Sequence, residues 1–157
     1  MEQKNTITVN EAIGSIPVND QAIVLELHNK AINAGYMAFG NKSARKSDFY
    51  KMEYKKSRKD DPLFILHVNG IKWSIRCKLF HLDKYVTLLH KLSEKMLAGI
   101  LSSRKCRGKA HGCTVGIMFT HVEKKYLLCR HGMHFRGITS GDVQAVWTLL
   151  STESTYR

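Results

Sequence analysis

The stretch that decides the fold is residues 63–79, which read LFILHVNGIKWSIRCKL. Two alternating apolar runs flank the pair Asn69-Gly70, which readily adopts the positive φ angles of a type I′ turn. The pattern predicts an antiparallel hairpin with Val68 opposite Ile71. This register gathers six apolar side chains on one face: Phe64, Leu66, Val68, Ile71, Trp73 and Ile75. A slip of one residue would turn the whole set outward, so we expect this face to be buried.

Further elements are predicted on both sides of this hairpin. Residues 49–55 alternate as a half-buried strand does, and a second hairpin is expected from 114–120 and 125–130, turning at 121–124. Apolar residues at helical spacing predict helices over 20–34 and 82–103, and a last helix capped at Thr139 or Ser140. We expect the helix over 82–103 to cover the first hairpin through Leu89, Leu92 and Met96.

This order of elements predicts an α+β protein. The expected architecture is a mainly antiparallel sheet with about three helices packed on one face, because that arrangement would bury all the apolar stripes. A length of 157 residues suits one domain spanning residues 1–157, in which 1–18 form an irregular lead-in. The polar start and the absence of an apolar run of about 20 residues favour a soluble, cytoplasmic protein without membrane contact.

The net charge of +12 is concentrated in the middle of the chain. Residues 42–109 contain 18 Lys and Arg against 6 Asp and Glu, which is itself a net of +12. Such a block attracts anionic partners at long range and also increases solubility.

The predicted strands place part of this charge on one outward surface. The candidate anion-binding residues are Lys51, Lys55, Arg58, Lys72, Arg76 and Lys78. Phe49 and His67 lie among them, so a single-stranded nucleic acid could meet the cations with its phosphates and stack its bases on a ring. An acidic protein is the other candidate partner. The alternative interpretation is a solvated, lysine-rich face that only prevents strand edges from aggregating.

A second candidate site is the group of cysteines and histidines within residues 106–134. Thiolates and imidazoles are the ligands that zinc prefers, and the candidate ligands are Cys106, Cys113, Cys129 and His131. The hairpin register turning at 121–124 brings Cys113 and His131 to the same open end. No Cys-x2-Cys or His-x3-His spacing occurs in this cluster, so the cofactor remains open, with zinc as the candidate.

Two other interpretations of these cysteines compete with a metal site. Arg104, Lys105 and Arg107 would favour a reactive thiolate at Cys106, which would suit a redox or thiol-dependent sensor. The alternative is that the thiols are ordinary structural side chains. Cys77, by contrast, alternates with the inward residues of the first hairpin and is expected in the core.

The sequence does not favour an enzyme. It contains no Gly-x-Ser-x-Gly elbow, Gly-x-Gly-x-x-Gly loop or phosphate-binding Lys-Ser/Thr motif. We therefore expect a binding protein for an anionic partner such as nucleic acid. A metal- or thiol-dependent sensor and a structural or interaction domain are the alternatives.

Overall fold

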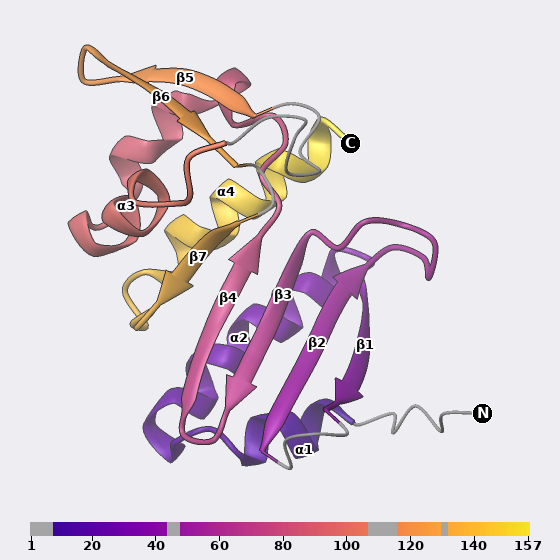
Figure 1. The fold of residues 1–157 in the computed structure, drawn as a ribbon. Coiled ribbons are helices and arrows are strands. Elements are labelled where there is room, and N and C mark those ends of the chain that lie inside the picture. Colours follow the sequence, from indigo (N-terminus) through magenta and orange to yellow (C-terminus); the bar gives the residue numbers. More distant parts are fainter. Residues whose placement is uncertain (1–7, 44–47, 107–115, 130–131) are drawn as a thin grey trace.

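The computed structural model in Figure 1 describes residues 8–43, 48–106, 116–129 and 132–157. In chain order its elements are α1 (Val9–Gly14), α2 (Val18–Asn33), β1 (Met37–Lys42), β2 (Phe49–Lys55), β3 (Phe64–Asn69), β4 (Lys72–Cys77), the 3₁₀ helices η1 (Leu82–Lys84) and η2 (Val86–Lys91), α3 (Glu94–Leu101), β5 (Ile117–His121), β6 (Lys124–Leu128), β7 (Met133–Arg136) and α4 (Val143–Thr155). Five strands form an antiparallel sheet in the order β1-β2-β3-β4-β7, and β5 pairs with β6. The predicted α+β class is confirmed.

The first hairpin forms, but its predicted register is wrong by two residues. Val68 pairs with Trp73 and Asn69 with Lys72, so Gly70-Ile71 make the turn. Gly70 has a φ of 59°, and among the described non-glycine residues only Val122 and Glu123 have positive φ. This combination fits a type II′ turn, which takes glycine first. Ile71 is consequently 76% exposed instead of buried.

The two-residue shift leaves the inward face almost unchanged, because side chains alternate with a period of two. Phe64, Leu66, Val68 and Ile75 are buried as expected, and Cys77 replaces Ile71 as the inward partner, opposite Phe64. Trp73 is partly buried and packs against this core. Burial raises the pKa of the Cys77 thiol, which behaves as a small core side chain.

The helix behind this hairpin is α2, not the predicted helix over 82–103. Figure 1 shows α1 and α2 behind the sheet, and Val24, Leu27 and Ala31 of α2 are buried in the core. The predicted cover through Leu89, Leu92 and Met96 is therefore wrong. These three residues are buried, but α3 packs beside β7.

The segment 82–101 is also not one continuous helix. Leu92 and Ser93 are extended, with ψ angles of 147° and 156°, and they separate η2 from α3. The Ser93 hydroxyl accepts a hydrogen bond from the backbone N–H of Met96, so this serine begins a new helix. The Ser93 cap thus interrupts the single helix that the spacing of apolar residues predicted over 82–103.

The N-terminal part is more ordered than predicted. Thr8 and Glu11 form a capping box that begins α1, so residues 9–14 are helical and not an irregular lead-in. At the other end of the chain, the carboxylate of Asp142 accepts hydrogen bonds from Thr139 before α4. Within the described ranges, no helix is long and apolar enough to cross a membrane.

The second hairpin has the predicted register. His121 pairs with Lys124 and Ile117 with Leu128 around the turn Val122-Glu123. Both turn residues have positive φ, 45° and 60°, as a type I′ turn requires. The chain then leaves this hairpin, and β7 joins β4 at the edge of the larger sheet.

Candidate anion-binding site

The outer face of the five-stranded sheet is the face opposite α1 and α2, and no described helix crosses β1–β4 on this side (Figure 1). The register places two rows of side chains across it: Phe39, Glu53, Ile65, Arg76 and His134 in one row, and Asn41, Lys51, His67, Ser74 and Arg136 in the next. The antiparallel order thus brings together residues from five strands. It joins the predicted candidates Lys51 and Arg76 to residues of β7.

Two of the predicted cations are paired with a carboxylate. Glu53 forms ion pairs with Lys51 at 2.5 Å and with Lys55 at 2.6 Å. Burial alone would raise the pKa of Glu53, but the hydrogen bonds from these lysines lower it, so the carboxylate stays ionised. The middle of the outer face therefore carries less excess charge than the count of lysines indicates.

The other predicted cations are dispersed. Lys78 forms an ion pair of 2.6 Å with Asp61, and the guanidinium of Arg58 lies 5.7 Å from the ring centre of Phe39. Lys72 is exposed at the start of β4, beside the turn. One of the six predicted residues, Arg76, lines a cleft.

This cleft lies between α3 with its following residues and the edge of the sheet formed by β4 and β7. Its volume is about 660 Å³. The residues that line it are Arg76, Lys95, Gly99, Ser102, Ser103, Arg104, Gly132, His134 and Arg136. Four are cations, two carry hydroxyl groups, and no carboxylate is among these described lining residues. The cleft can therefore offer several hydrogen-bond donors to one anion.

Close packing of α3 on β7 fixes one wall of the cleft. A Cβ atom built on Gly99 would lie 2.9 Å from the backbone oxygen of His134, which is closer than real Cβ contacts allow. Glycine at position 99 thus lets the helix approach the strand. Nearby, the Lys95 ammonium donates a hydrogen bond of 3.1 Å to the Gly137 carbonyl, which holds this cation at the rim.

Two histidines connect the cleft to the middle of the outer face. The rings of His67 and His134 are 6.4 Å apart. Burial, with the nearby His134, Lys51 and Arg76, lowers the pKa of His67 to about 4, and burial with Arg76 and Arg136 also lowers the pKa of His134. Both imidazoles are therefore neutral at physiological pH. Nε2 of His67 and Nδ1 of His134 are buried without a hydrogen-bond partner among the described residues.

The proposed metal ligands are described only in part. Cys113 and His131 lie outside the described residues. Cys106 and Cys129 are half-buried and lie on neighbouring extended segments, because the Cys106 N–H donates to the Leu127 carbonyl and the Cys129 N–H to the Arg104 carbonyl. Across the ranges that the structure describes, no group of three or more His, Cys, Asp or Glu side chains could hold a metal. The zinc prediction thus has no support from these residues.

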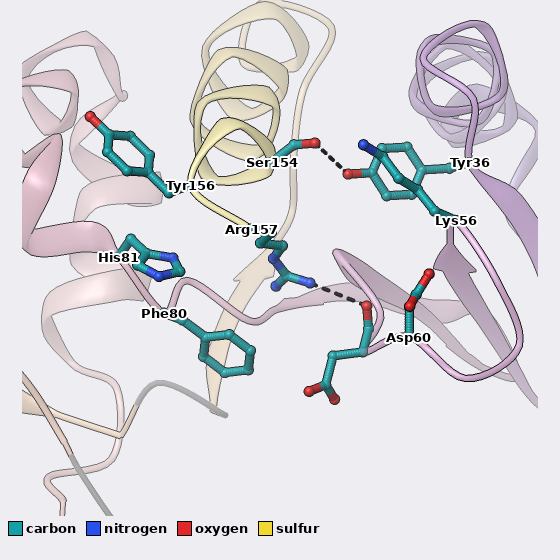
Figure 2. A pocket seen from close by; sticks show the side chains of 9 residues that line it. Tyr36, Lys56, Asp60, Phe80, His81, Ser154, Tyr156 and Arg157 are labelled. Carbon is teal, nitrogen blue, oxygen red and sulfur yellow. Dashed lines mark hydrogen bonds between the residues drawn. The ribbon is translucent and has the colours of Figure 1, made fainter.

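A second cavity, of about 550 Å³, lies near the end of α4 (Figure 2). Lys56 and Arg157 line it together with Asp60 and Asp61, so its charges balance. Arg157 is also held by the backbone oxygens of Asp61 and Lys78. This cavity therefore has no preference for an anion.

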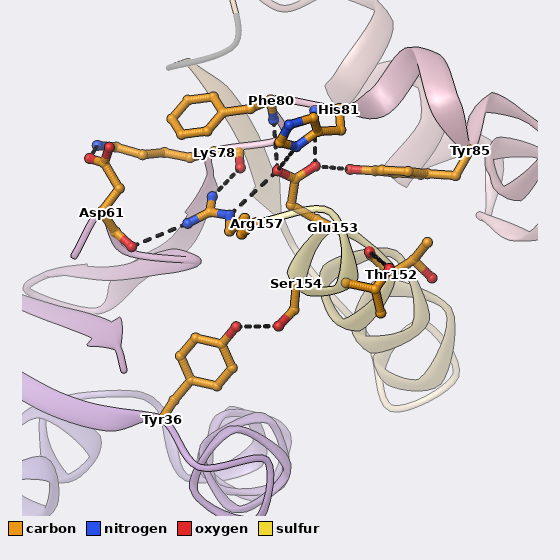
Figure 3. A network of polar contacts seen from close by, with 11 residues as sticks. Tyr36, Asp61, Lys78, Phe80, His81, Tyr85, Thr152, Glu153, Ser154 and Arg157 are labelled. Atoms are coloured by element: carbon orange, nitrogen blue, oxygen red, sulfur yellow. Dashed lines mark hydrogen bonds and ion pairs between the residues drawn. The ribbon is translucent and has the colours of Figure 1, made fainter. Parts of the chain in front are cut away.

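A buried carboxylate lies beside this second cavity. Glu153 of α4 is 0% exposed and accepts hydrogen bonds from the backbone N–H groups of Phe80 and His81, the imidazole of His81, the hydroxyl of Tyr85 and the guanidinium of Arg157 (Figure 3). Burial, together with the hydrogen bond to Glu153, raises the pKa of Tyr85, so its hydroxyl remains a donor. The carboxylate anchors α4 to the segment 80–85.

Sequence reasoning missed most of the cleft. Lys95 was counted only in the basic block, Arg104 was assigned to the candidate thiolate at Cys106, and Arg136 and His134 were not considered as anion ligands. The short alternating run Met133–Arg136 was the available signal, because its pairing with β4 brings Arg136 and His134 beside Arg76. No protein-family model, curated protein or solved structure matches this chain.

Proposed function

We propose that this protein binds a polyanion, and that the cleft between α3 and β7 holds one of its phosphate groups. The observation that carries the proposal is the lining of the cleft, where Arg76, Lys95, Arg104 and Arg136 gather and no carboxylate is among the described residues. Arginine suits phosphate because its planar fork can donate two parallel hydrogen bonds. The hydroxyl groups of Ser102 and Ser103 add uncharged donors at the same place.

The charge distribution supports this cleft over the rest of the outer face. Glu53 partly neutralises Lys51 and Lys55, and Asp61 pairs with Lys78. We therefore expect a polyanion to be attracted most strongly to the β7 edge, where no carboxylate is among the described residues that line the cleft. Counterions released from each phosphate contact would contribute most of the binding free energy.

The test measures binding of inorganic polyphosphate, which carries charge but no bases. The double substitution Arg104→Gln and Arg136→Gln should weaken this binding about tenfold or more, because two charge-assisted contacts are lost. The matched control is Arg58→Gln with Lys72→Gln, which removes the same charge outside the cleft and should have a much smaller effect. Affinity should also fall steeply with salt.

Two results would overturn the proposal. One is polyphosphate binding that both double variants weaken equally, since that would indicate only long-range attraction by net charge. The other is the absence of binding at low salt. Thermal melting of each variant tests whether it is folded. We expect all four substitutions to be tolerated, because these residues lie at the surface or at the rim of the cleft.

A further inference from the structure

A row of aromatic rings leads away from the cleft across the outer face. His134 lines the cleft, the ring of His67 lies 6.4 Å from it, and the ring of Phe49 lies 5.8 Å beyond His67. The three rings come from β7, β3 and β2. At about 4.8 Å between strands, β2 and β7 are about 14 Å apart, which is the scale of a few nucleotides and not of a single phosphate.

This row, here called the ring row (Phe49, His67 and His134), begins at the cleft beside α3 and continues over β3 and β2, which no described helix covers on this side (Figure 1). Phe49 and His67 are each partly exposed. Ser74 pairs with both His67 and Arg136 in the register. The rings are tilted to one another, by 49° between Phe49 and His67 and by 42° between His67 and His134, so each ring would take a separate flat group.

Cations lie beside two of the three rings. Lys51 lies beside His67 in one row, and Arg76 lies beside His134 in the other. A polymer with charged groups at regular intervals and flat apolar groups between them could contact both the cations and the rings. Single-stranded nucleic acid has this chemistry, since its bases are free to stack while its phosphates contact Lys and Arg.

We propose that the polyanion is a single-stranded nucleic acid, with a phosphate in the cleft and the adjoining bases stacked on the ring row. This inference rests on the proposed function and adds the class of ligand. Duplex nucleic acid does not satisfy the geometry, because its bases are stacked on each other and cannot lie on a protein ring. Stacking is tolerant of base identity, so we expect weak sequence preference.

The experiment compares two ligands in the same assay: a labelled single-stranded oligonucleotide of about ten residues and inorganic polyphosphate. Phe49→Leu removes the ring at the end of the row and keeps an apolar side chain. It should weaken oligonucleotide binding about tenfold, as loss of one stacked base does, and leave polyphosphate binding unchanged. The matched control is Tyr126→Leu, which removes a partly exposed ring on the separate β5–β6 hairpin.

A second variant keeps the test sharp if Phe49→Leu fails to fold. His67→Leu should also weaken oligonucleotide binding selectively, and a duplex of the same sequence should bind the unmodified protein more weakly than the single strand. Oligonucleotide affinity that neither ring substitution changes would overturn the class of ligand, while the dependence of polyphosphate binding on Arg104 and Arg136 would still support the cleft. If neither ligand binds, the proposed function itself fails.

Discussion

The indole Nε1 of Trp73 donates a hydrogen bond of 2.9 Å to the carboxylate of Asp20. The bond joins β4 to the first turn of α2 across 53 residues of sequence. The partly buried indole thus contributes both apolar contact area and a polar tip with a fixed partner. It helps to define which helix lies behind the hairpin.

Substituting Trp73 separates these two contributions. Trp73→Phe keeps an aromatic ring and loses the hydrogen bond, so the free energy of unfolding should fall by about 1–2 kcal/mol. Trp73→Ala should cost more, about 3 kcal/mol, because apolar contacts are also lost. Urea denaturation provides the measurement. Equal stability of Trp73→Phe and the unmodified protein would show that the bond to Asp20 contributes nothing.

The buried carboxylate of Glu153 should be among the most sensitive positions in the chain. Glu153→Gln replaces one acceptor oxygen by an NH2 group that faces donors, so we expect a loss of about 3 kcal/mol or more in the free energy of unfolding. Glu26→Gln, which breaks an exposed ion pair with Lys30, is the control and should cost less than about 0.5 kcal/mol. Thermal and urea unfolding of the two variants would test the difference.

A substitution in the turn of the second hairpin should increase the stability of the protein. Val122 is β-branched, 76% exposed and has a φ of 45°, a region that asparagine adopts more readily than valine. Val122→Asn should therefore increase the free energy of unfolding by about 1 kcal/mol. Ile71→Asn is a matched control, because Ile71 is equally exposed in a two-residue turn but is not in the positive-φ region. A gain in both variants, or in neither, would contradict this explanation.

Stability should depend on pH through His67. Its pKa falls from an ordinary value near 6.5 to about 4 in the folded protein, so the unfolded chain binds more protons between these values. The free energy of unfolding should therefore decrease as pH falls from about 6.5 toward 4. His28 and His134, whose pKa values are also lowered, act in the same direction.

Melting temperatures measured from pH 7.5 to 4.5 would show this decrease. The variant His67→Gln should reduce the slope, because glutamine does not titrate. His90→Gln, at an exposed position, is the comparison. An unchanged slope in His67→Gln would show that other groups control the acid sensitivity.

Local patterns in the sequence predicted the strands of the first hairpin and the register of the second. They failed where two patterns competed. Asn69-Gly70 is a strong turn signal, yet the chain turns at Gly70-Ile71, and this two-residue shift keeps the inward alternation while it pairs Cys77 with Phe64. The spacing of apolar residues over 82–103 likewise predicted helical structure, but the Ser93 cap separates α3 from the preceding 3₁₀ helix η2.

The candidate site was less predictable than the fold because it depends on pairing between distant segments. Arg76 and Arg136 line the same cleft although 60 residues of sequence separate them, and only the pairing of β4 with β7 brings them together. Counting charges identified the basic block. It did not show that Glu53 forms ion pairs with both Lys51 and Lys55 and neutralises part of the predicted surface.

The position of Glu153 also constrains how the chain can be assembled during translation. Its donors Phe80, His81 and Tyr85 precede it by 68 to 73 residues. At about 5–20 residues per second, a ribosome needs roughly 4–15 s to synthesise that interval. During this time these donors lack the carboxylate that accepts their hydrogen bonds in the folded protein. Docking of α4 is therefore a late step in biosynthesis, and a nascent chain stalled before Glu153 keeps this part of the core open.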